Sequence, residues 1–427
     1  MKKAVCALVA AVLCLGWGAG AGQVLAASAK GTDLMAGLSK SACAPRPGTP
    51  DEAARKGIGK FSADLLEASL EKNGGNVMVS PASVFLALAM AANGAEGSTK
   101  ADMLAALAGK GMPLDRVNRA SRDWMARLSR TGEKTTLGIA NSIWFNKTFR
   151  PARPFLQRNA DFFGAAARRL DFADRGALAV INGWVKDATR GTIDRIIEKI
   201  RRDDVMFLVN AVYFKSDWQV PFEKDDTGKA VFHAPKRDVE TDFMHRTGGM
   251  TLLAPKGASG VALPYDDGRF VFFALLPEGK TTPREWFARQ DRASVFGELV
   301  RMAAKKPAAT VRLALPKFES RYEDGLVDEL TGLGMGAAFD AARADFSGMG
   351  ENRARDLFIG EVRHKTFVRV DEKGTEASAV TSVGIRLTSM PPSGPELVFD
   401  RPFLYGILDL ETGIPLFTGV MEDPTAR

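Results

Sequence analysis

The segment DEKGTEASAVTSVGIRLTSMPPSGP, residues 371–395, combines a strand pattern with an ending that no strand can continue through. From Thr375 to Leu387, apolar, small or threonine side chains alternate with mostly polar ones. This alternation is typical of a strand with one buried and one exposed face. Its leading end is small, because Gly374 precedes Thr-Glu-Ala-Ser-Ala, and its far end runs into Met-Pro-Pro-Ser-Gly-Pro. The segment therefore has the pattern of a complete strand whose first side chains are too small to anchor it.

The start of the chain has the pattern of an export signal. Two lysines precede an apolar run from Ala4 to Trp17, and small residues follow. We expect a secretory signal peptide over residues 1–29, cleaved after Ala26 or Ala29, and therefore a secreted, extracellular or periplasmic protein. No later apolar run reaches the length of a membrane span, so no membrane partner is predicted.

The rest of the chain is predicted to be a linker and one domain. Residues 30–50 are rich in Pro, Gly and Ser and are expected to be a flexible linker, and residues 51–427 form the domain. Of the three cysteines only Cys43 remains after loss of the signal, so no intrachain disulfide is possible and the fold must depend on its core. Cys43 lies in the linker and is expected to have no role.

The charge pattern argues against nucleic-acid binding. The net charge is +7, which loss of two lysines with the signal lowers by two, and 51 acidic residues are interspersed among 58 basic ones. The densest basic stretch places Arg116, Arg119 and Arg122 at helical spacing. A solvated helix face is the favoured interpretation, and weak polyanion binding is the alternative.

Helical patterns dominate the first third of the chain and strand patterns the remainder. SPASVFLALAMAANGA, residues 80–95, predicts an apolar helix opened by Ser80 and Pro81. DVMFLVNAVYFKSDWQ, residues 204–219, is apolar almost throughout, as expected for a central strand buried on both faces. Together these patterns favour an α+β fold with large mixed sheets.

Several long segments resemble the serpin family. VRHKTFVRVDEKGTEASA, residues 362–379, resembles the serpin hinge, and VFDRPFLYGILDLETGIPLFTGVMEDP, residues 398–424, resembles the C-terminal strands. Further segments in the family's order extend the resemblance over residues 51–427. It implies one α+β serpin-like domain with a large central mixed sheet, two smaller sheets, about eight or nine helices and an exposed reactive loop at about 372–395.

The resemblance also implies a function. A serpin is not an enzyme: its loop is cleaved by a target protease, and the leading half of the loop then inserts into the main sheet and traps the protease as an acyl complex. The expected partner is a serine endopeptidase, or a papain-like cysteine protease, and a monomer without cofactor or metal is expected. The alternation from Thr375 onward is then the pattern of a strand that has not yet entered its sheet.

Site residues follow from the same resemblance. The hinge comprises Glu372, Gly374, Thr375, Glu376, Ala377, Ser378 and Ala379. A polar cluster beneath the sheet, the shutter, comprises Ser80, Ser83, Asn210 and His364. Trp218 falls at the top of the sheet, where insertion begins. The family's spacing from the hinge glycine places the reactive bond between Thr388 and Ser389, with Leu387 and Arg386 as alternatives.

The residues argue against two rival functions. A non-inhibitory serpin acting as a chaperone or ligand carrier typically has charged or bulky hinge residues, and Thr-Glu-Ala-Ser-Ala shows no such defect. A secreted hydrolase is disfavoured because the chain has only three histidines, and none lies near a nucleophile motif or at metal-ligand spacing.

Overall fold

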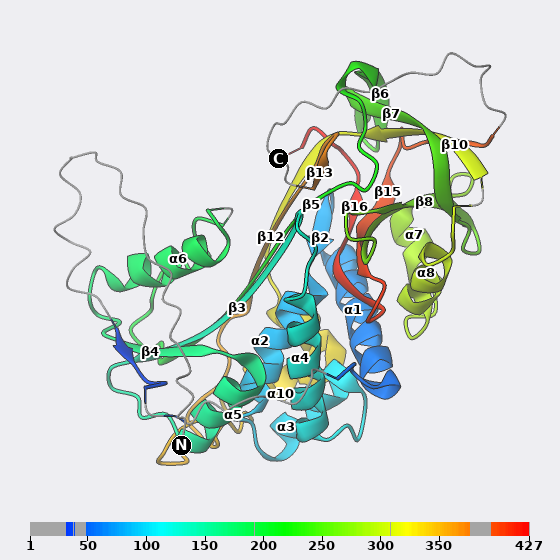
Figure 1. Cartoon of the computed structure of the whole chain (residues 1–427). Helices are drawn as coiled ribbons and strands as arrows, with labels where there is room; N and C mark the ends of the chain where they lie inside the picture. Colours follow the sequence, from blue (N-terminus) through cyan, green and yellow to red (C-terminus); the bar gives the residue numbers. More distant parts are fainter. Residues whose placement is uncertain are drawn as a thin grey trace, which may run out of the picture.

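Helices form the first third of the domain and pack below and beside two sheets (Figure 1). The computed structural model describes residues 31–36, 38, 48–191, 193–307, 309–375 and 394–426. Eight α-helices and a further helical stretch, α9, η2 and α10, kinked at Gly334, lie in these residues, which fits the expected number. Their bounds are α1 Glu52–Lys72, α2 Pro81–Ala92, α3 Gly97–Ala108, α4 Leu114–Leu128, α5 Arg153–Phe163, α6 Ala177–Ala188, α7 Pro283–Ala288, α8 Val295–Ala303, α9 Val327–Leu330, η2 Thr331–Met335 and α10 Gly336–Phe339.

A seven-stranded mixed sheet runs through the molecule in the order β1-β4-β3-β5-β13-β12-β11, and it is the predicted large central sheet. β3 and β4 are parallel, and the other neighbours are antiparallel. The strands are β1 Thr32–Asp33, β3 Thr135–Asn146, β4 Ala166–Leu170, β5 Met206–Asp217, β11 Phe318–Gly325, β12 Arg363–Val370 and β13 Gly374–Thr375.

The remaining strands form a nine-stranded assembly in the order β14-β10-β7-β8-β9-β15-β16-β2, with β6 also paired to β7. Two smaller sheets were expected, and the 17-residue β7 belongs to both: its first part pairs with β6 and β10, and its end pairs with β8. The strands are β2 Val77–Val79, β6 Thr227–Ala234, β7 Arg237–Leu253, β8 Ala258–Pro264, β9 Phe270–Pro277, β10 Ala309–Pro316, β14 Glu396–Val398, β15 Phe403–Asp409 and β16 Ile414–Met421.

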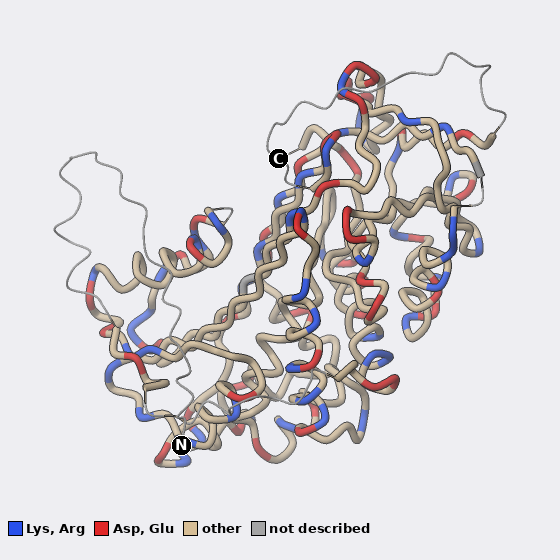
Figure 2. Tube along the Cα trace, in the orientation of Figure 1, with Lys and Arg blue, Asp and Glu red and all other residues tan. Residues whose placement is uncertain are grey.

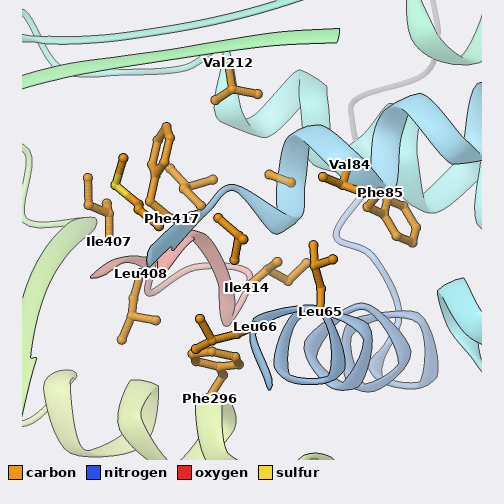
Figure 3. Packing of buried hydrophobic residues seen from close by; sticks show 14 of the residues in the cluster. Leu65, Leu66, Val84, Phe85, Val212, Phe296, Ile407, Leu408, Ile414 and Phe417 are labelled. Carbon is orange, nitrogen blue, oxygen red and sulfur yellow. The ribbon is translucent and has the colours of Figure 1, made fainter. Parts of the chain in front are cut away.

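Helix α2 lies between the two sheets, where it contacts β5 and β16. Ser80 caps its first turn by accepting a hydrogen bond from the backbone N–H of Ser83, and Pro81 occupies the first helical position, as predicted. Side chains from α1, α2, β5, α8, β15 and β16 meet around it in the core (Figure 3). Alternate residues of β5 reach opposite faces, because Val209 packs with α6 while Val212 packs with this core. β5 is thus buried on both sides, as its sequence predicts.

Part of the predicted linker is ordered against the domain. Thr32 and Asp33 form β1, which pairs with β4, and the Leu34 N–H donates to the Ala167 carbonyl at 2.9 Å. The expectation of a flexible linker over all of residues 30–50 is therefore wrong for these residues, because β4 offers an open edge that accepts a strand. The predicted signal peptide and Cys43 lie outside the described residues. Within the described part of the chain, none of the helices has the length and apolarity needed to cross a membrane.

Candidate functional site

The start of the predicted hinge lies inside the seven-stranded sheet. Gly374 and Thr375 form β13, which pairs antiparallel with Asp217 and Ser216 of β5 on one side and, through Thr375, with Val370 of β12 on the other. A Cβ at position 374 would lie 2.0 Å from the Ser216 carbonyl oxygen. Backbone therefore approaches backbone so closely that this position requires glycine.

A tight turn, residues 371–374, leads from β12 into β13. The Asp371 N–H donates to the Gly374 carbonyl at 3.0 Å, and the Asp371 Oδ1 accepts from the backbone N–H of Lys373 at 2.9 Å. Burial raises the pKa of the Asp371 carboxyl, while these backbone donors oppose that rise. The turn thus reverses the chain by local hydrogen bonds, which is how β13 can lie beside the strand that precedes it.

Trp218, the residue predicted at the top of the sheet, holds this turn through two hydrogen bonds. Its backbone N–H donates to the Lys373 carbonyl at 2.6 Å, and its Nε1–H donates to the Asp371 carbonyl at 2.8 Å. Its ring stacks on Tyr265 with centroids 4.7 Å apart and planes 13° apart. The Tyr265 hydroxyl in turn lies 2.6 Å from Thr375 Oγ1, and both side chains are buried. Trp218 and Tyr265 therefore fix the hinge backbone and the first hinge side chain together.

Glu372 is fixed by the side chains of Thr227, the first residue of β6, and Lys317, which lies between β10 and β11. Its Oε1 accepts from Lys317 Nζ at 2.8 Å and from Thr227 Oγ1 at 3.0 Å. Burial alone would raise the pKa of Glu372, but Lys317 and Thr227 outweigh burial, and this pKa is lowered. The Glu372 carbonyl also accepts from the Phe222 N–H at 2.8 Å. Neither Lys317 nor Thr227 stood out in the sequence, because both residues are far from the hinge along the chain.

Below β13, the two flanking strands separate. Among the described residues, no backbone pairing joins β5 directly to β12, so the two-residue β13 is the link between them. A cavity of about 240 Å³ lies there. It is lined by the first five residues of β5, by residues 356–364 and by one face of α2. Among the described residues, no strand therefore pairs with β5 and β12 between the hinge and this cavity, which lies at the opposite end of β5.

The predicted shutter residues lie on both sides of this cavity. The Ser80 N–H donates to His364 Nε2 at 3.0 Å, and Ser83 Oγ contacts the Asn210 carbonyl at 3.5 Å. The Asn210 amide donates to Asn141 Oδ1 at 2.7 Å, a partner that the sequence did not indicate, and no hydrogen bond between described residues joins Asn210 to His364. Burial lowers the pKa of His364 to about 4, so the ring is neutral at neutral pH. The shutter thus links the two strands only indirectly, through Ser80 and Ser83 at the start of α2.

The other predicted loop residues cannot be placed. The following lie outside the described residues: Glu376, Ala377, Ser378, Ala379, Arg386, Leu387, Thr388 and Ser389.

The basic face of α4 is largely compensated by acidic neighbours. Arg116 makes a bidentate ion pair with Asp51, at 2.7 and 2.8 Å, and Arg122 pairs with Asp123 at 2.8 Å. Figure 2 shows blue and red segments interspersed along the trace, without a face reserved for one sign. This arrangement favours the solvated-face interpretation over polyanion binding.

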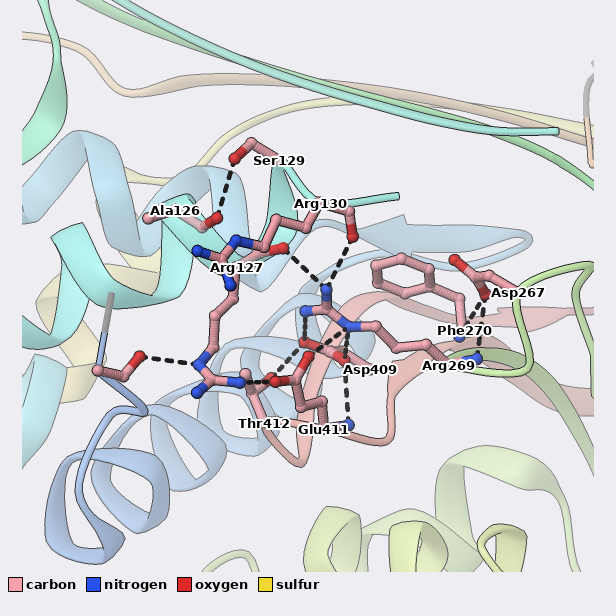
Figure 4. A network of polar contacts seen from close by, with 11 residues as sticks. Ala126, Arg127, Ser129, Arg130, Asp267, Arg269, Phe270, Asp409, Glu411 and Thr412 are labelled. Carbon is pink, nitrogen blue, oxygen red and sulfur yellow. Dashed lines mark hydrogen bonds and ion pairs between the residues drawn. The ribbon is translucent and has the colours of Figure 1, made fainter. Parts of the chain in front are cut away.

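At the end of α4 a buried ion-pair network joins three elements (Figure 4). Arg269, just before β9, makes a bidentate pair with the fully buried Asp409 of β15, at 2.7 and 2.8 Å. It also donates to the carbonyls of Arg127 and Arg130, at 2.8 and 3.2 Å, which satisfies the end of α4. Arg127 also pairs with Glu411, so the network anchors α4 to the turn between β15 and β16 and compensates the charges of Arg127 and Arg269.

Comparison with known proteins agrees with this geometry. The family model described as "Serpin (serine protease inhibitor)" matches residues 56–424. An uncharacterised serpin-like protein from Thermococcus kodakarensis is 34% identical over 375 residues, covering 86% of this chain and 85% of its own. The leukocyte elastase inhibitor of Equus caballus is 31% identical over 375 residues, covering 85% of this chain and 97% of its own.

Solved structures show the same architecture and discriminate between two of its forms. The thermophilic serpin Tengpin in its native state has a TM-score of 0.84 at 34% identity, covering 92% of this chain and 99% of its own. Tengpin in its latent state has a TM-score of 0.76, covering 88% of this chain and 99% of its own. The structure is therefore more similar to the native than to the latent form, and the chain belongs to the serpin family.

Proposed function

We propose that this serpin is an exported suicide-substrate inhibitor of serine endopeptidases. One observation carries the proposal: β13 already lies between β5 and β12, two strands that are otherwise unpaired in the described residues and have a cavity between them. Two strands joined at the hinge end and not paired with each other below it, among the described residues, are the arrangement that loop insertion needs. The polar contacts of Trp218, Tyr265 and Lys317 place the chain at the entrance to that position.

Trapping then follows in two steps. The protease nucleophile attacks the reactive-bond carbonyl, the peptide bond breaks, and the new amino terminus leaves with a proton while the acyl bond to the protease forms. The freed segment extends β13 downward between β5 and β12, drawing the attached protease with it. A catalytic site tolerates displacements of only about 1 Å, so this movement stops deacylation. The alternating side chains after Thr375 suit one face directed to the core and one to solvent.

The sequence around the proposed reactive bond favours a target that accepts small side chains. Thr388 would precede the cleaved bond, and a relative of 31% identity is named as an inhibitor of leukocyte elastase. Arg386 would suit a trypsin-like protease and Leu387 a chymotrypsin-like one. We infer an elastase-like or subtilisin-like target outside the cytoplasm, inhibited by the monomer.

A panel of proteases tests the function. The protein without residues 1–29 is incubated with elastase-like, subtilisin-like, chymotrypsin-like, trypsin-like and papain-like enzymes, and denaturing electrophoresis is used to detect complexes that survive boiling in detergent. We expect at least one such complex, with a C-terminal fragment whose mass corresponds to a start at Ser389. Cleavage of the loop by every active protease without any covalent complex would overturn the inhibitory function. A fragment that starts at Leu387 or Thr388 from an efficient complex would move the reactive bond.

A further inference from the structure

At the end of β11 remote from the hinge, one ammonium faces three carboxyl groups. The Nζ of Lys72, the last residue of α1, lies 3.1 Å from Glu329 Oε2, 3.3 Å from Asp328 Oδ2 and 3.7 Å from Asp324 Oδ1. The Asp328 side chain is 84% exposed and is screened by water, whereas that of Glu329 is 1% exposed. Two largely buried carboxyl groups, on β11 and α9, thus share a single cation. The proposed inhibitory mechanism uses none of these groups.

The hydrogen-bond donors around the two carboxyl groups are distributed unequally. Asp324 Oδ2 accepts from the Tyr322 hydroxyl at 2.8 Å and from the Asn73 amide at 2.7 Å, and its Oδ1 accepts from the Gly325 N–H at 2.7 Å. A carboxylate with three donors stays ionised. Glu329 receives only Lys72, on Oε2, and its Oε1 is buried without a hydrogen-bond partner. A buried carboxyl oxygen without a donor is the natural position for a proton.

We propose that Glu329 keeps its carboxyl proton in the folded protein at neutral pH and donates it to the Asp324 carboxylate. The cluster then carries one buried negative charge, on Asp324, and one positive charge, on Lys72, and each has its partner. Loss of the proton would leave two buried carboxylates competing for one ammonium. The contact joins α1, α9 and β11, so the proton-bound state holds these three elements together most strongly.

The pKa directions agree with this geometry and set the pH window. Burial, reinforced by Asp324, raises the pKa of Glu329 above its ordinary value of 4.5. Stability from this proton is therefore complete below pH 4.5 and is lost as the pH rises through the raised pKa. Burial opposes ionisation of Asp324 too, but its donors outweigh burial and lower its pKa below 3.8. The cluster is thus most stable in mild acid.

Other charged groups pack against the cluster and must be separated from it. His364 lies directly opposite Asp324 in the β11–β12 register, and burial lowers its pKa, so its contribution to stability falls when the medium becomes acidic. Arg284 of α7 binds the carbonyls of Leu70 and Asn73 beside Lys72 and is paired with Glu422. A variant of Glu329 alone retains His364 and Arg284. Comparing its pH–stability profile with that of wild type therefore cancels the contributions of these two groups.

Glu329→Gln provides that comparison, because it preserves the shape of the side chain and cannot ionise. Thermal midpoints of wild type and variant are measured at one scan rate between pH 5 and pH 8.5. We expect the midpoint of the variant to rise relative to wild type with increasing pH, by about 2 °C for each unit by which the Glu329 pKa is raised. Glu52→Gln on α1, an exposed carboxyl paired with Lys56 at 2.7 Å, serves as the control and should leave the profile unchanged. Parallel profiles of wild type and Glu329→Gln would overturn the proposal.

Infrared spectroscopy of the wild type decides the protonation state even if Glu329→Gln does not fold. A protonated carboxyl gives a carbonyl stretch separate from that of carboxylates, and we expect this band at pH 7. Glu67→Gln is the matched buried control, because Glu67 is a second buried glutamate, on α1, whose pKa is raised by burial although Arg292 lies beside it. The band should persist in Glu67→Gln and disappear in Glu329→Gln. Absence of any protonated carboxyl band in wild type at pH 7, or its loss in Glu67→Gln alone, would contradict the assignment.

Discussion

The upper and lower halves of the space between β5 and β12 are built differently. In the upper half, β13 pairs with both strands, and Trp218, Tyr265 and Lys317 hold the hinge by side-chain hydrogen bonds. In the lower half there is a cavity of about 240 Å³, and the shutter residues Asn210 and His364 bond to separate partners. Thus β13 joins the two strands in the upper half, while no described residue pairs with them both in the lower half.

This difference bears on how strand insertion can begin at the hinge before the loop is cut. Each residue that enters gains backbone pairings on two sides, yet it must also give up conformational freedom of about 1–2 kcal/mol. At the hinge, fixed donors and a glycine make this exchange favourable for two residues. The proposed function requires that this exchange does not extend into the lower half until the loop is cut, and that the native fold is therefore protected kinetically.

The largest expected effect comes from filling the lower half. Cutting the loop frees its leading segment, which can add a strand of about a dozen residues and on the order of ten hydrogen bonds at about 1 kcal/mol each before ordering costs. We expect the nicked protein to unfold about 10 °C or more above the intact protein. Calorimetry before and after nicking measures this shift. An equal or lower midpoint after nicking would mean that the lower half does not accept the loop.

The second-largest effect is expected from a substitution that blocks strand insertion in the upper half. Thr375 is 1% exposed, so Thr375→Arg would place an unpaired guanidinium inside the sheet at a cost of several kcal/mol. The cleavage rate should barely change, while the yield of covalent complex collapses. Thr375→Ser keeps the small hydroxyl side chain and should still trap the protease. Equal yields from the Arg and Ser variants would show that this position does not limit insertion.

The buried histidine below the hinge should make the lower half sensitive to acid. The pKa of His364 falls from 6.5 in the unfolded chain to about 4 in the folded protein, so its stabilisation is complete above pH 6.5 and is lost as the pH drops toward 4. The shift corresponds to on the order of 3 kcal/mol. His364→Gln should flatten the stability profile between pH 6.5 and 4.

The exposed His233 provides a control for this measurement. It pairs with Asp238 at 2.8 Å on the β6–β7 hairpin, far from the sheet opening along the chain, so His233→Gln should retain the acid sensitivity of wild type. If His364→Gln shows the same acid loss as His233→Gln, His364 is not the responsible group.

The smallest expected effect concerns a single contact at the hinge. Tyr265→Phe removes the hydroxyl that meets Thr375 Oγ1, which is worth about 1 kcal/mol. We expect the hinge to leave the sheet more often, with faster proteolysis of the hinge region and a severalfold change in inhibition rate. The double variant Tyr265→Phe/Thr375→Val completes a mutant cycle. Additive effects in that cycle would show that the two hydroxyl groups do not interact.

Several site residues could be predicted because local patterns carry them. The hinge glycine, the small residues after it, Trp218 and the four shutter residues lie within segments whose order and spacing resemble serpins. The structure joins Glu372, Gly374, Thr375 and Trp218 in one network. Ser83, Asn210 and His364 line one cavity, and Ser80 bonds to His364. The sequence did not indicate their individual hydrogen bonds, and the roles of these residues in loop insertion stay predictions.

Other residues had no signal in the sequence. Tyr265, Lys317, Thr227 and Asn141 look like ordinary strand residues, and only the pairing of distant strands makes them partners of the hinge and shutter. The order of residues 32–34 was also missed, since a short edge strand depends on an open neighbour rather than on its own pattern.

The sequence by itself determined the class of fold, the family, and the segment able to become a strand, because alternation, helical periodicity and turn residues are local properties of the chain. Only the tertiary structure decided which strands Gly374 and Thr375 pair with, which donors hold the hinge, and where a buried carboxyl lacks a donor. Burial and hydrogen-bond satisfaction depend on residues far apart in sequence, such as Thr375 with Tyr265 and Lys72 with Glu329. The proposed protonation of Glu329 and the lack of direct pairing between the described strands β5 and β12 depend on such distant contacts, since no local pattern specifies either.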